Sequence, residues 1–196
     1  SQGLPKIIEE TIKFTEMDWG LHFIGHFGEL TTKNTEELDS TEGELSAGSL
    51  YHGPNTLVTD IHFNKENAFI QYAFETPLDE NTTRIYLVNM RNCMLEPELD
   101  DRVRDINAQV ADEDQEILEN LWPVRTPDTM TRELLTTTDE MVVHYRKHLK
   151  KWDALGWRLD TKKLARTDGD VAYAIPCPAR RESGNWILDE APCIAG

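Results

Sequence analysis

The chain has 196 residues, a formal net charge of -16 at pH 7 and a sequence pI near 4.7. This length suits one domain with a proper hydrophobic core. The excess of acidic residues argues against nucleic acid or an anionic membrane as a partner, because both are bound through basic surfaces. No apolar run is long enough for a membrane span, and no signal-peptide pattern opens the chain.

The three cysteines, Cys93, Cys177 and Cys193, are far apart in the sequence. Their number is odd and their spacing matches neither a zinc site nor a disulfide framework. Such cysteines are typical of a reducing compartment, so we expect a cytoplasmic protein. The chain opens on Ser1 rather than Met and enters a strand-like segment almost at once, so we expect a fragment of a longer protein or a tag remnant.

The first half of the chain consists of short segments that alternate apolar and polar residues, a pattern typical of antiparallel strands. About five strands are predicted, at residues 7–14, 21–27, 57–63, 68–74 and 82–92. A hairpin turn is predicted between the third and fourth of them. Residues 31–48 are polar and acidic without a sustained period, so we expect a surface loop there.

A long helix is predicted at residues 95–121, where apolar residues recur at steps of three and four. This apolar stripe consists of Val103, Ile106, Val110, Ile117, Leu118 and Leu121. Asp114 falls within the stripe, four residues after Val110 and three before Ile117. Burial of an unpaired carboxylate is costly, so an inward-facing Asp114 predicts a cationic partner or a metal ion. The alternative is a carboxylate at the edge of the stripe that is hydrogen-bonded or solvated.

A second helix is predicted to begin at the capping box formed by Thr137 and Glu140 and to end near Gly156. Its apolar face consists of Met141, Val142, Tyr145, Leu149 and Trp152. Strands followed by long helices predict an α+β fold. In this arrangement a helix lies across the concave face of a curved antiparallel sheet and encloses a cavity.

The sequence after the second helix is irregular, with a hairpin predicted between residues 171–175 and 186–188. No internal repeat or low-complexity linker divides the chain. We therefore assign residues 1–156 to one domain and residues 157–196 to a C-terminal extension that packs on the same domain.

Asp18, His22 and His26 offer the two histidines and one carboxylate of a facial iron(II) site. The surrounding alternation predicts a strand, however, in which positions four apart lie roughly 13 Å from one another. Solvent-facing histidines are therefore the favoured interpretation. His144 and His148, four apart on the second helix, are only a weak candidate pair. The chain has no serine nucleophile elbow, phosphate loop or dinucleotide fingerprint.

Two stretches have a familiar form, PLDENTTRIY at residues 77–86 running on to Arg91-Asn92, and EDQEILE at residues 113–119. In this order and spacing they resemble the C-terminal catalytic domain of Rieske non-haem iron oxygenase α subunits, in the ring-hydroxylating and O-demethylase-like branch. Asp139 with YRKHL at residues 145–149 resembles the closing helix of that family. The resemblance spans about residues 7–155.

The resemblance implies a helix-grip fold of the START/Bet v1 type and a role for Asp114 as the carboxylate ligand of a mononuclear Fe(II). It also implies a [2Fe–2S] cluster, O₂, and electrons from NAD(P)H through a separate reductase or ferredoxin. The intact enzyme would hydroxylate, demethylate or desaturate an apolar or aromatic substrate held between sheet and helix. Arg84 and Tyr86 lie on a strand that would line this pocket, and homotrimers are common in the family.

The chain departs from the family pattern in two places. It has neither the cysteine and histidine ligands of the Rieske cluster nor the motif that supplies two histidines to the iron. We therefore expect the two histidine ligands upstream of Ser1 and the cluster in a missing N-terminal domain, and we expect this chain alone to bind iron poorly and to be inactive. The alternatives are a non-enzymatic helix-grip module that binds a hydrophobic ligand, and an oxygenase relative retained as a structural subunit.

Overall fold

The computed structural model describes residues 7–27, 45–79, 81–124, 133–136, 139–156, 158–166, 172–174, 177–184 and 188–194. Its strands are β1 (Lys13–Met17), β2 (Gly20–His26), β3 (Ser46–His52), β4 (Thr56–His62), β5 (Ala68–Pro77) and β6 (Thr83–Arg91). Its main helices are α2 (Asp100–Glu119) and α3 (Glu140–Ala154), and the shorter ones are η1 (Glu9–Thr11), η2 (Pro97–Leu99), α4 (Thr161–Leu164) and α5 (Pro178–Ser183).

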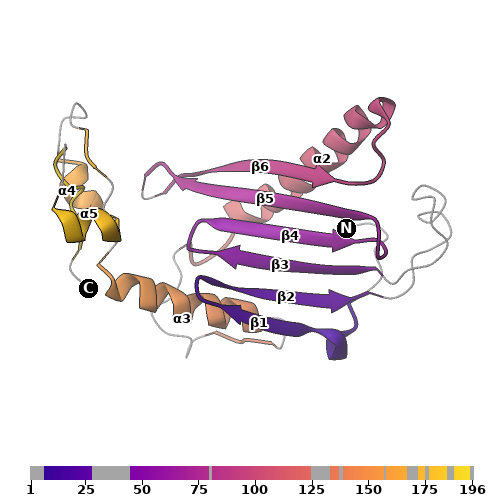
Figure 1. Cartoon of the computed structure of the whole chain (residues 1–196), viewed down its shortest axis with the longest axis horizontal. Coiled ribbons are helices and arrows are strands. Elements are labelled where there is room, and N and C mark those ends of the chain that lie inside the picture. The colour runs from indigo at the N-terminus through magenta and orange to yellow at the C-terminus, as the bar shows by residue number, and fades with distance from the viewer. Residues whose placement is uncertain are drawn as a thin grey trace.

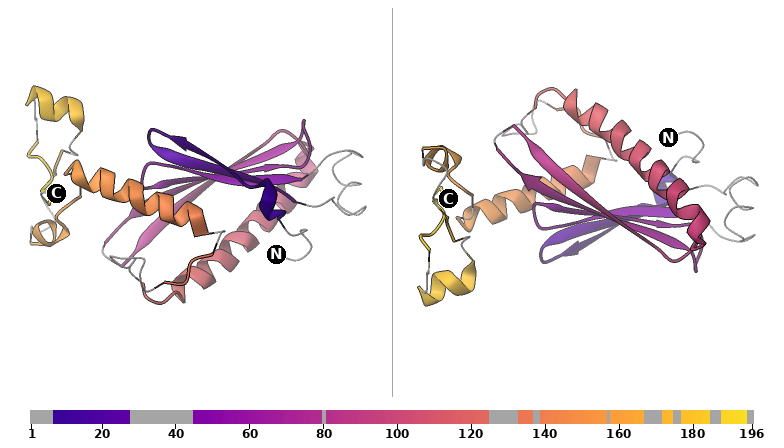
Figure 2. Two further views of the ribbon diagram at one scale, coloured as in Figure 1. Left: turned by 90° about the horizontal axis from the view of Figure 1, so that it is seen from below. Right: turned by 90° about the horizontal axis from the view of Figure 1, so that it is seen from above.

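The six strands form one antiparallel sheet in which each strand pairs with its neighbour in sequence, in the order β1 to β6 (Figure 1). Both α2 and α3 lie on the same side of this curved sheet (Figure 2). We call that side the inner face and the opposite side the outer face. The expected α+β architecture, a curved antiparallel sheet gripped by long helices, is confirmed.

One central strand was not predicted. Strand β3 includes residues 46–48, which were assigned to the loop, and it pairs with β2 on one side and β4 on the other. Its first residues are Ser46, Ala47, Gly48 and Ser49, so no alternation of apolar residues marks it. It is a strand because both of its edges are paired, which local sequence does not reveal. The rest of the predicted loop up to residue 44 lies outside the described residues.

The two ends of the chain also differ from the prediction. Residues 9–11 form the 3-10 helix η1, so the first strand begins at Lys13 rather than at residue 7. Near the C-terminus, Ala174 forms an isolated parallel bridge with Glu190 instead of an antiparallel hairpin. Residues 171, 175, 176 and 185–187 of the predicted hairpin lie outside the described part of the chain.

The core lies between the inner face and α3. Leu21 of β2, Tyr51 of β3 and Trp152 of α3 are its buried members. The partly buried residues around them are Phe14, Leu57, Met141, Tyr145 and Leu149. The predicted apolar face of the second helix is therefore confirmed at four of its five positions, while Val142 is exposed. Burial of such side chains is the main favourable term that holds α3 on the sheet.

The buried residue of helix α2 and its hydrogen bond to the sheet both lie in its first half. Val103 is its one buried residue, and Gln71 of β5 donates a hydrogen bond from Nε2 to Oδ1 of Asn107 at 2.7 Å. From there the helix moves away from the sheet toward its C-terminal end (Figure 2). The stripe was predicted to be buried, and this is wrong for Ile106, Val110, Ile117, Leu118 and Leu121, which are exposed. Helical periodicity shows which residues share a face, but not how closely that face packs.

The described C-terminal residues lie beyond the end of α3, away from the sheet (Figure 1). Arg158 forms an ion pair with Asp153 of α3, with Nε 2.9 Å from Oδ1, and Leu159 forms a bridge with Cys193. The domain division at residue 156 stays a prediction. Among the described residues, no helix has the length and apolar character that crossing a membrane requires.

Candidate functional site

Asp114 lies on the side of α2 that faces the sheet. It follows Val103 by eleven residues and Asn107 by seven, close to three and two full turns of an α-helix. Val103 is buried and Asn107 binds Gln71, so these two residues mark the inward side of the helix. Of the other acidic residues in the same half, Asp112, Glu116 and Glu119 fall on the opposite side of the helix by the same count, and Glu113 lies between the two sides. The predicted orientation of Asp114 therefore agrees with the helical phase.

The prediction that Asp114 is buried is wrong. Its side chain is exposed, because it belongs to the C-terminal half of α2, which lies farther from the sheet. The free-energy cost of burying a lone carboxylate therefore does not apply in this structure, and it does not require a cationic partner. The structure leaves two features of Asp114: its orientation, and its exposed apolar neighbours Ile117 and Leu118 on the same side of α2, with Leu121 just after the end of the helix.

The described residues do not form an iron site by themselves. No group of three or more His, Cys, Asp or Glu side chains in the described part of the chain is arranged to hold a metal ion. A mononuclear iron centre requires a set of several converging ligands. Asp114 can supply one carboxylate and no more, so the residues present do not fit the metal without further ligands.

Arg84 and Tyr86 face away from the helices. The residues of β5 and β6 that contact α2 or the segment just before it are Gln71 and Arg91, the latter through an ion pair with Asp100. Arg84 and Tyr86 have the opposite parity to Arg91 on the same strand, so they lie on the outer face of the sheet. This placement corrects the expectation that they line a pocket between sheet and helix.

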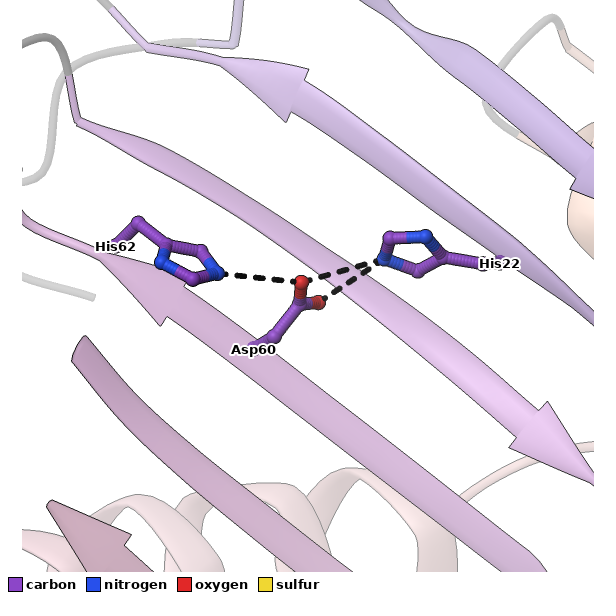
Figure 3. Close-up of polar contacts among 3 residues, drawn as sticks. All are labelled: His22, Asp60 and His62. Carbon is purple, nitrogen blue, oxygen red and sulfur yellow. Dashed lines mark hydrogen bonds and ion pairs between the residues drawn. The ribbon is translucent and has the colours of Figure 1, made fainter. Parts of the chain in front are cut away.

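His22, Asp60 and His62 come together on the outer face (Figure 3). The carboxylate of Asp60 accepts a hydrogen bond from Nε2 of His22, which lies 3.2 Å from Oδ2 and 3.4 Å from Oδ1. Nε2 of His62 lies 3.6 Å from the same Oδ2. The carboxylate sits between the two rings, an arrangement suited to hydrogen bonding and charge pairing rather than to metal ligation.

A glycine makes this cross-strand contact possible. His22 is on β2 and Asp60 on β4, with Gly48 of β3 between the two strands. A Cβ atom at Gly48 would lie only 2.9 Å from Oδ1 of Asp60. Spacing along the sequence groups His22 with Asp18 and His26 instead, because it relates only neighbours in the sequence. The contact with Asp60 depends on the pairing register of β2, β3 and β4, which brings together residues 38 positions apart.

A second polar chain joins the sheet to α3. Oη of Tyr51 lies 2.7 Å from Nδ1 of His148, and Nε2 of His148 lies 3.4 Å from Oε1 of Glu16. A carboxylate only accepts, so Nε2 carries a proton, and on a neutral ring Nδ1 then accepts a hydrogen bond from the tyrosine hydroxyl. Burial, followed by the charge of Glu16 and by Tyr145, raises the pKa of Tyr51 to about 12. Tyr51 is therefore a neutral donor at physiological pH.

His144 and His148, the candidate pair on the second helix, contact different partners. His148 is buried and stacks on Trp152 with ring centroids 5.6 Å apart. His144 stacks on Phe14 and lies 3.7 Å from a carboxylate oxygen of Glu140 on its own helix. Both histidines therefore have structural partners. The three cysteines are free, and burial raises the pKa of the Cys93 thiol.

Comparison with known protein families gives one match. The family model for the vanillate O-demethylase oxygenase C-terminal domain matches residues 43–155, more than half of the chain. The matched region includes strands β3 to β6, both long helices and Asp114. No curated protein is similar enough in sequence to match the chain. The chain therefore belongs to the family of vanillate O-demethylase oxygenase C-terminal domains, and it is a C-terminal domain of the Rieske oxygenase type.

Proposed function

We propose that this chain is the catalytic domain of an oxygenase that activates O₂ at a mononuclear non-haem Fe(II). Its substrate would be an apolar or aromatic molecule that is hydroxylated, demethylated or desaturated. Family membership supports the oxygenase class. The observation that carries the proposal within the structure is the position of Asp114 on the inward side of α2, in phase with Val103 and Asn107.

The surroundings of Asp114 fit an apolar substrate. Ile117 and Leu118 are apolar, exposed and on the same side of α2 as Asp114 by helical phase, and Leu121 is exposed two residues after the helix ends. Small-molecule sites in proteins are mostly apolar with a few placed polar groups. Asp114 and its aliphatic neighbours have this composition, one polar group among apolar side chains. Arg84 and Tyr86 have no part in this proposal, because they lie on the outer face.

Asp114 would be one ligand of the iron, and the two histidine ligands are expected outside the described residues. The [2Fe–2S] cluster is likewise expected in another domain, supplied with electrons from NAD(P)H by a reductase. It follows that this chain alone should bind Fe(II) weakly and show no turnover. A cytoplasmic location and a homotrimeric assembly belong to the same proposal.

The test compares Asp114→Ala with Asp112→Ala in the protein made from the complete reading frame. Both residues are exposed aspartates of α2, but they lie on opposite sides of the helix. We expect Asp114→Ala to lose the mononuclear iron and turnover, while the visible absorption of the cluster is unchanged. We expect Asp112→Ala to retain the mononuclear iron, turnover and the cluster absorption. Iron is counted by elemental analysis and the cluster by its absorption.

Two results would contradict the proposal. Turnover near the wild-type rate in Asp114→Ala would remove this residue from the site. Tight, stoichiometric binding of Fe(II) by the isolated chain would contradict the need for further ligands. A colourless product no longer than this chain would favour the non-enzymatic alternative, in which the same apolar side of α2 binds a hydrophobic ligand.

A further inference from the structure

The charges of the chain are distributed unevenly along its sequence. Half of its 20 Lys and Arg residues lie between residues 146 and 181, together with only four of its 36 Asp and Glu residues. From residue 105 to residue 124, in contrast, the chain has six acidic residues and no Lys or Arg. A chain with a net charge of -16 therefore has a locally positive part, formed by α3 and the residues after it, and a strongly negative part on α2.

The negative charge of α2 is concentrated on its outward side. Asp112, Glu116 and Glu119 are exposed and lie opposite the inward residues by helical phase, and we call these three residues the acidic stripe. Like charges at positions i and i+4, such as Asp112 and Glu116, destabilise a helix. The last turn of α2 contains no basic residue, although the helix dipole favours cations there. A cationic surface placed against the acidic stripe would reduce both unfavourable terms.

The positive charge begins on the outward side of α3. Lys147 and Lys150 are exposed and lie opposite the buried Trp152 by helical phase. Neither lysine has an ion-pair partner in the described part of the chain. The residues beyond the end of α3 continue the positive charge (Figure 1). We define the basic region as Lys147 and Lys150 with four further exposed residues, Arg158, Lys162, Lys163 and Arg166.

The acidic stripe and the basic region do not pair within one copy of the chain. Among the described residues, the ion pairs of α2 are made with its own residues or with Arg91, and none joins α2 to α3 or to the residues after α3. Both helices lie on the inner side of the sheet, so their outward sides point away from it (Figure 2). Two complementary surfaces of this kind can meet only between copies.

We propose that the acidic stripe of one copy binds the basic region of the next, and that three copies close head to tail into a ring. The inference rests on the homotrimeric assembly that belongs to the proposed function. A contact between two different surfaces of the same chain is heterologous, and heterologous contacts form closed rings. In such a ring each copy uses its acidic stripe once and its basic region once, so no like-charged surfaces face each other.

Exposed apolar side chains accompany both charged surfaces. Trp122 and Val124 follow the acidic stripe, and Leu155 and Leu159 lie within the sequence of the basic region. Stable interfaces combine a few aromatic or aliphatic anchors with a polar rim. Ion pairs at such a rim contribute little affinity by themselves, but they select the partner surface and its orientation. Trp122 is therefore the expected anchor, and the charges decide which surface it meets.

The test reverses the charges and measures the mass of the protein made from the complete reading frame by light scattering. We expect three chains for the wild type. The double variants Lys147→Glu, Lys150→Glu and Glu116→Lys, Glu119→Lys should each dissociate at concentrations at least about tenfold higher than the wild type does. All four substitutions together restore opposite charges across the contact and should restore the trimer.

The matched control is Lys65→Glu with Arg84→Glu, since both are exposed basic residues outside the basic region. It should remain as stable a trimer as the wild type. Circular dichroism shows whether each variant retains its fold.

A carbodiimide cross-link tests the contact in the wild type and does not depend on any variant folding. This reagent joins a Lys amine directly to a carboxylate, so it reports side chains in contact. Isotope-labelled and unlabelled proteins are mixed in high salt and returned to low salt, because salt screens exposed charge pairs. We expect peptides of mixed label that join Lys147 or Lys150 to Glu116 or Glu119.

Three results would overturn the proposal: a wild type that is not a trimer, a trimer unaffected by either charge reversal, and the absence of these mixed cross-links. If the basic region instead binds a different acidic protein, the reversal variants remain trimers. Mass and cross-links require neither iron nor turnover, so failure of the Asp114 test would leave them unchanged. Conversely, a trimer that ignores charge reversal would leave the role of Asp114 standing.

Discussion

The hydroxyl of Tyr51 and the ring of His148 form a buried hydrogen bond, 2.7 Å from Oη to Nδ1, between a central strand and α3. The two residues are 97 positions apart in the sequence. His148 is 2% exposed, and its other nitrogen faces Glu16. This bond joins α3 to the sheet, while Trp152 stacks on the His148 ring and Tyr145 contacts the Tyr51 ring edge-on.

Removal of the Tyr51 hydroxyl should destabilise the fold. In Tyr51→Phe the ring remains but the buried Nδ1 of His148 loses its donor, which costs about 1–3 kcal/mol in the free energy of unfolding. Urea denaturation followed by circular dichroism measures this change. Tyr86→Phe removes a hydroxyl from an exposed ring and should change the free energy by less than about 0.5 kcal/mol. Equal losses in the two variants would show that the bond to His148 contributes nothing.

Stability should fall in alkaline solution because of the same tyrosine. The pKa of Tyr51 is raised from 10.0 to about 12 in the folded chain, so the native state holds this proton more tightly than the unfolded state does. Its contribution is complete below pH 10 and is lost as the pH rises toward 12, with a slope of about 1.4 kcal/mol per pH unit between these values. Burial and the charge of Glu75 raise the pKa of Tyr145 in the same direction.

The measurement is the free energy of unfolding at several pH values from 9 to 11, in the wild type and in Tyr51→Phe. The wild type should lose more stability over this range than the variant, because only the wild type must ionise Tyr51. Parallel pH profiles for the two proteins would show that Tyr51 does not titrate with a raised pKa.

The glycine between His22 and Asp60 should not tolerate a side chain. In Gly48→Ala the new Cβ would overlap the carbonyl oxygen of Phe23 and press on the Asp60 carboxylate. Backbone on a paired strand cannot move aside cheaply, so we expect a loss of about 3 kcal/mol. Gly53→Ala is the comparison, because there φ is +74° and no atom lies within 4 Å, so only the backbone conformation is strained, at about 1–2 kcal/mol. Thermal unfolding should rank Gly48→Ala as the less stable of the two.

Two tryptophans should differ sharply in their contribution to stability. Trp152 is 8% exposed and belongs to the core between the sheet and α3, so Trp152→Ala should cost about 3–5 kcal/mol. Trp122 is 89% exposed after the end of α2, and Trp122→Ala should have little effect on the isolated chain. Chemical denaturation of both variants checks the difference. Similar midpoints would mean that the core of Leu21, Tyr51 and Trp152 does not hold α3 on the sheet.

The sequence alone determined the features that follow from local periodicity. The alternating segments predicted four of the six strands near their observed positions, and the step of three and four identified Tyr145, Leu149 and Trp152 as the inward face of α3. The same step placed Asp114 on the inward side of α2. Periodicity succeeds here because side-chain direction along a helix or strand depends only on the backbone of that element.

The tertiary structure decided the rest. Strand β3 exists because two neighbours pair with it, although its small and polar residues carry no strand signal. The contacts of Asp60 with His22 and of His148 with Tyr51 depend on pairing register and on helix docking, which join residues 38 and 97 positions apart. The exposure of Asp114 depends on the angle at which α2 leaves the sheet. Local sequence determines in which direction a side chain points, whereas long-range packing determines which residues that side chain contacts.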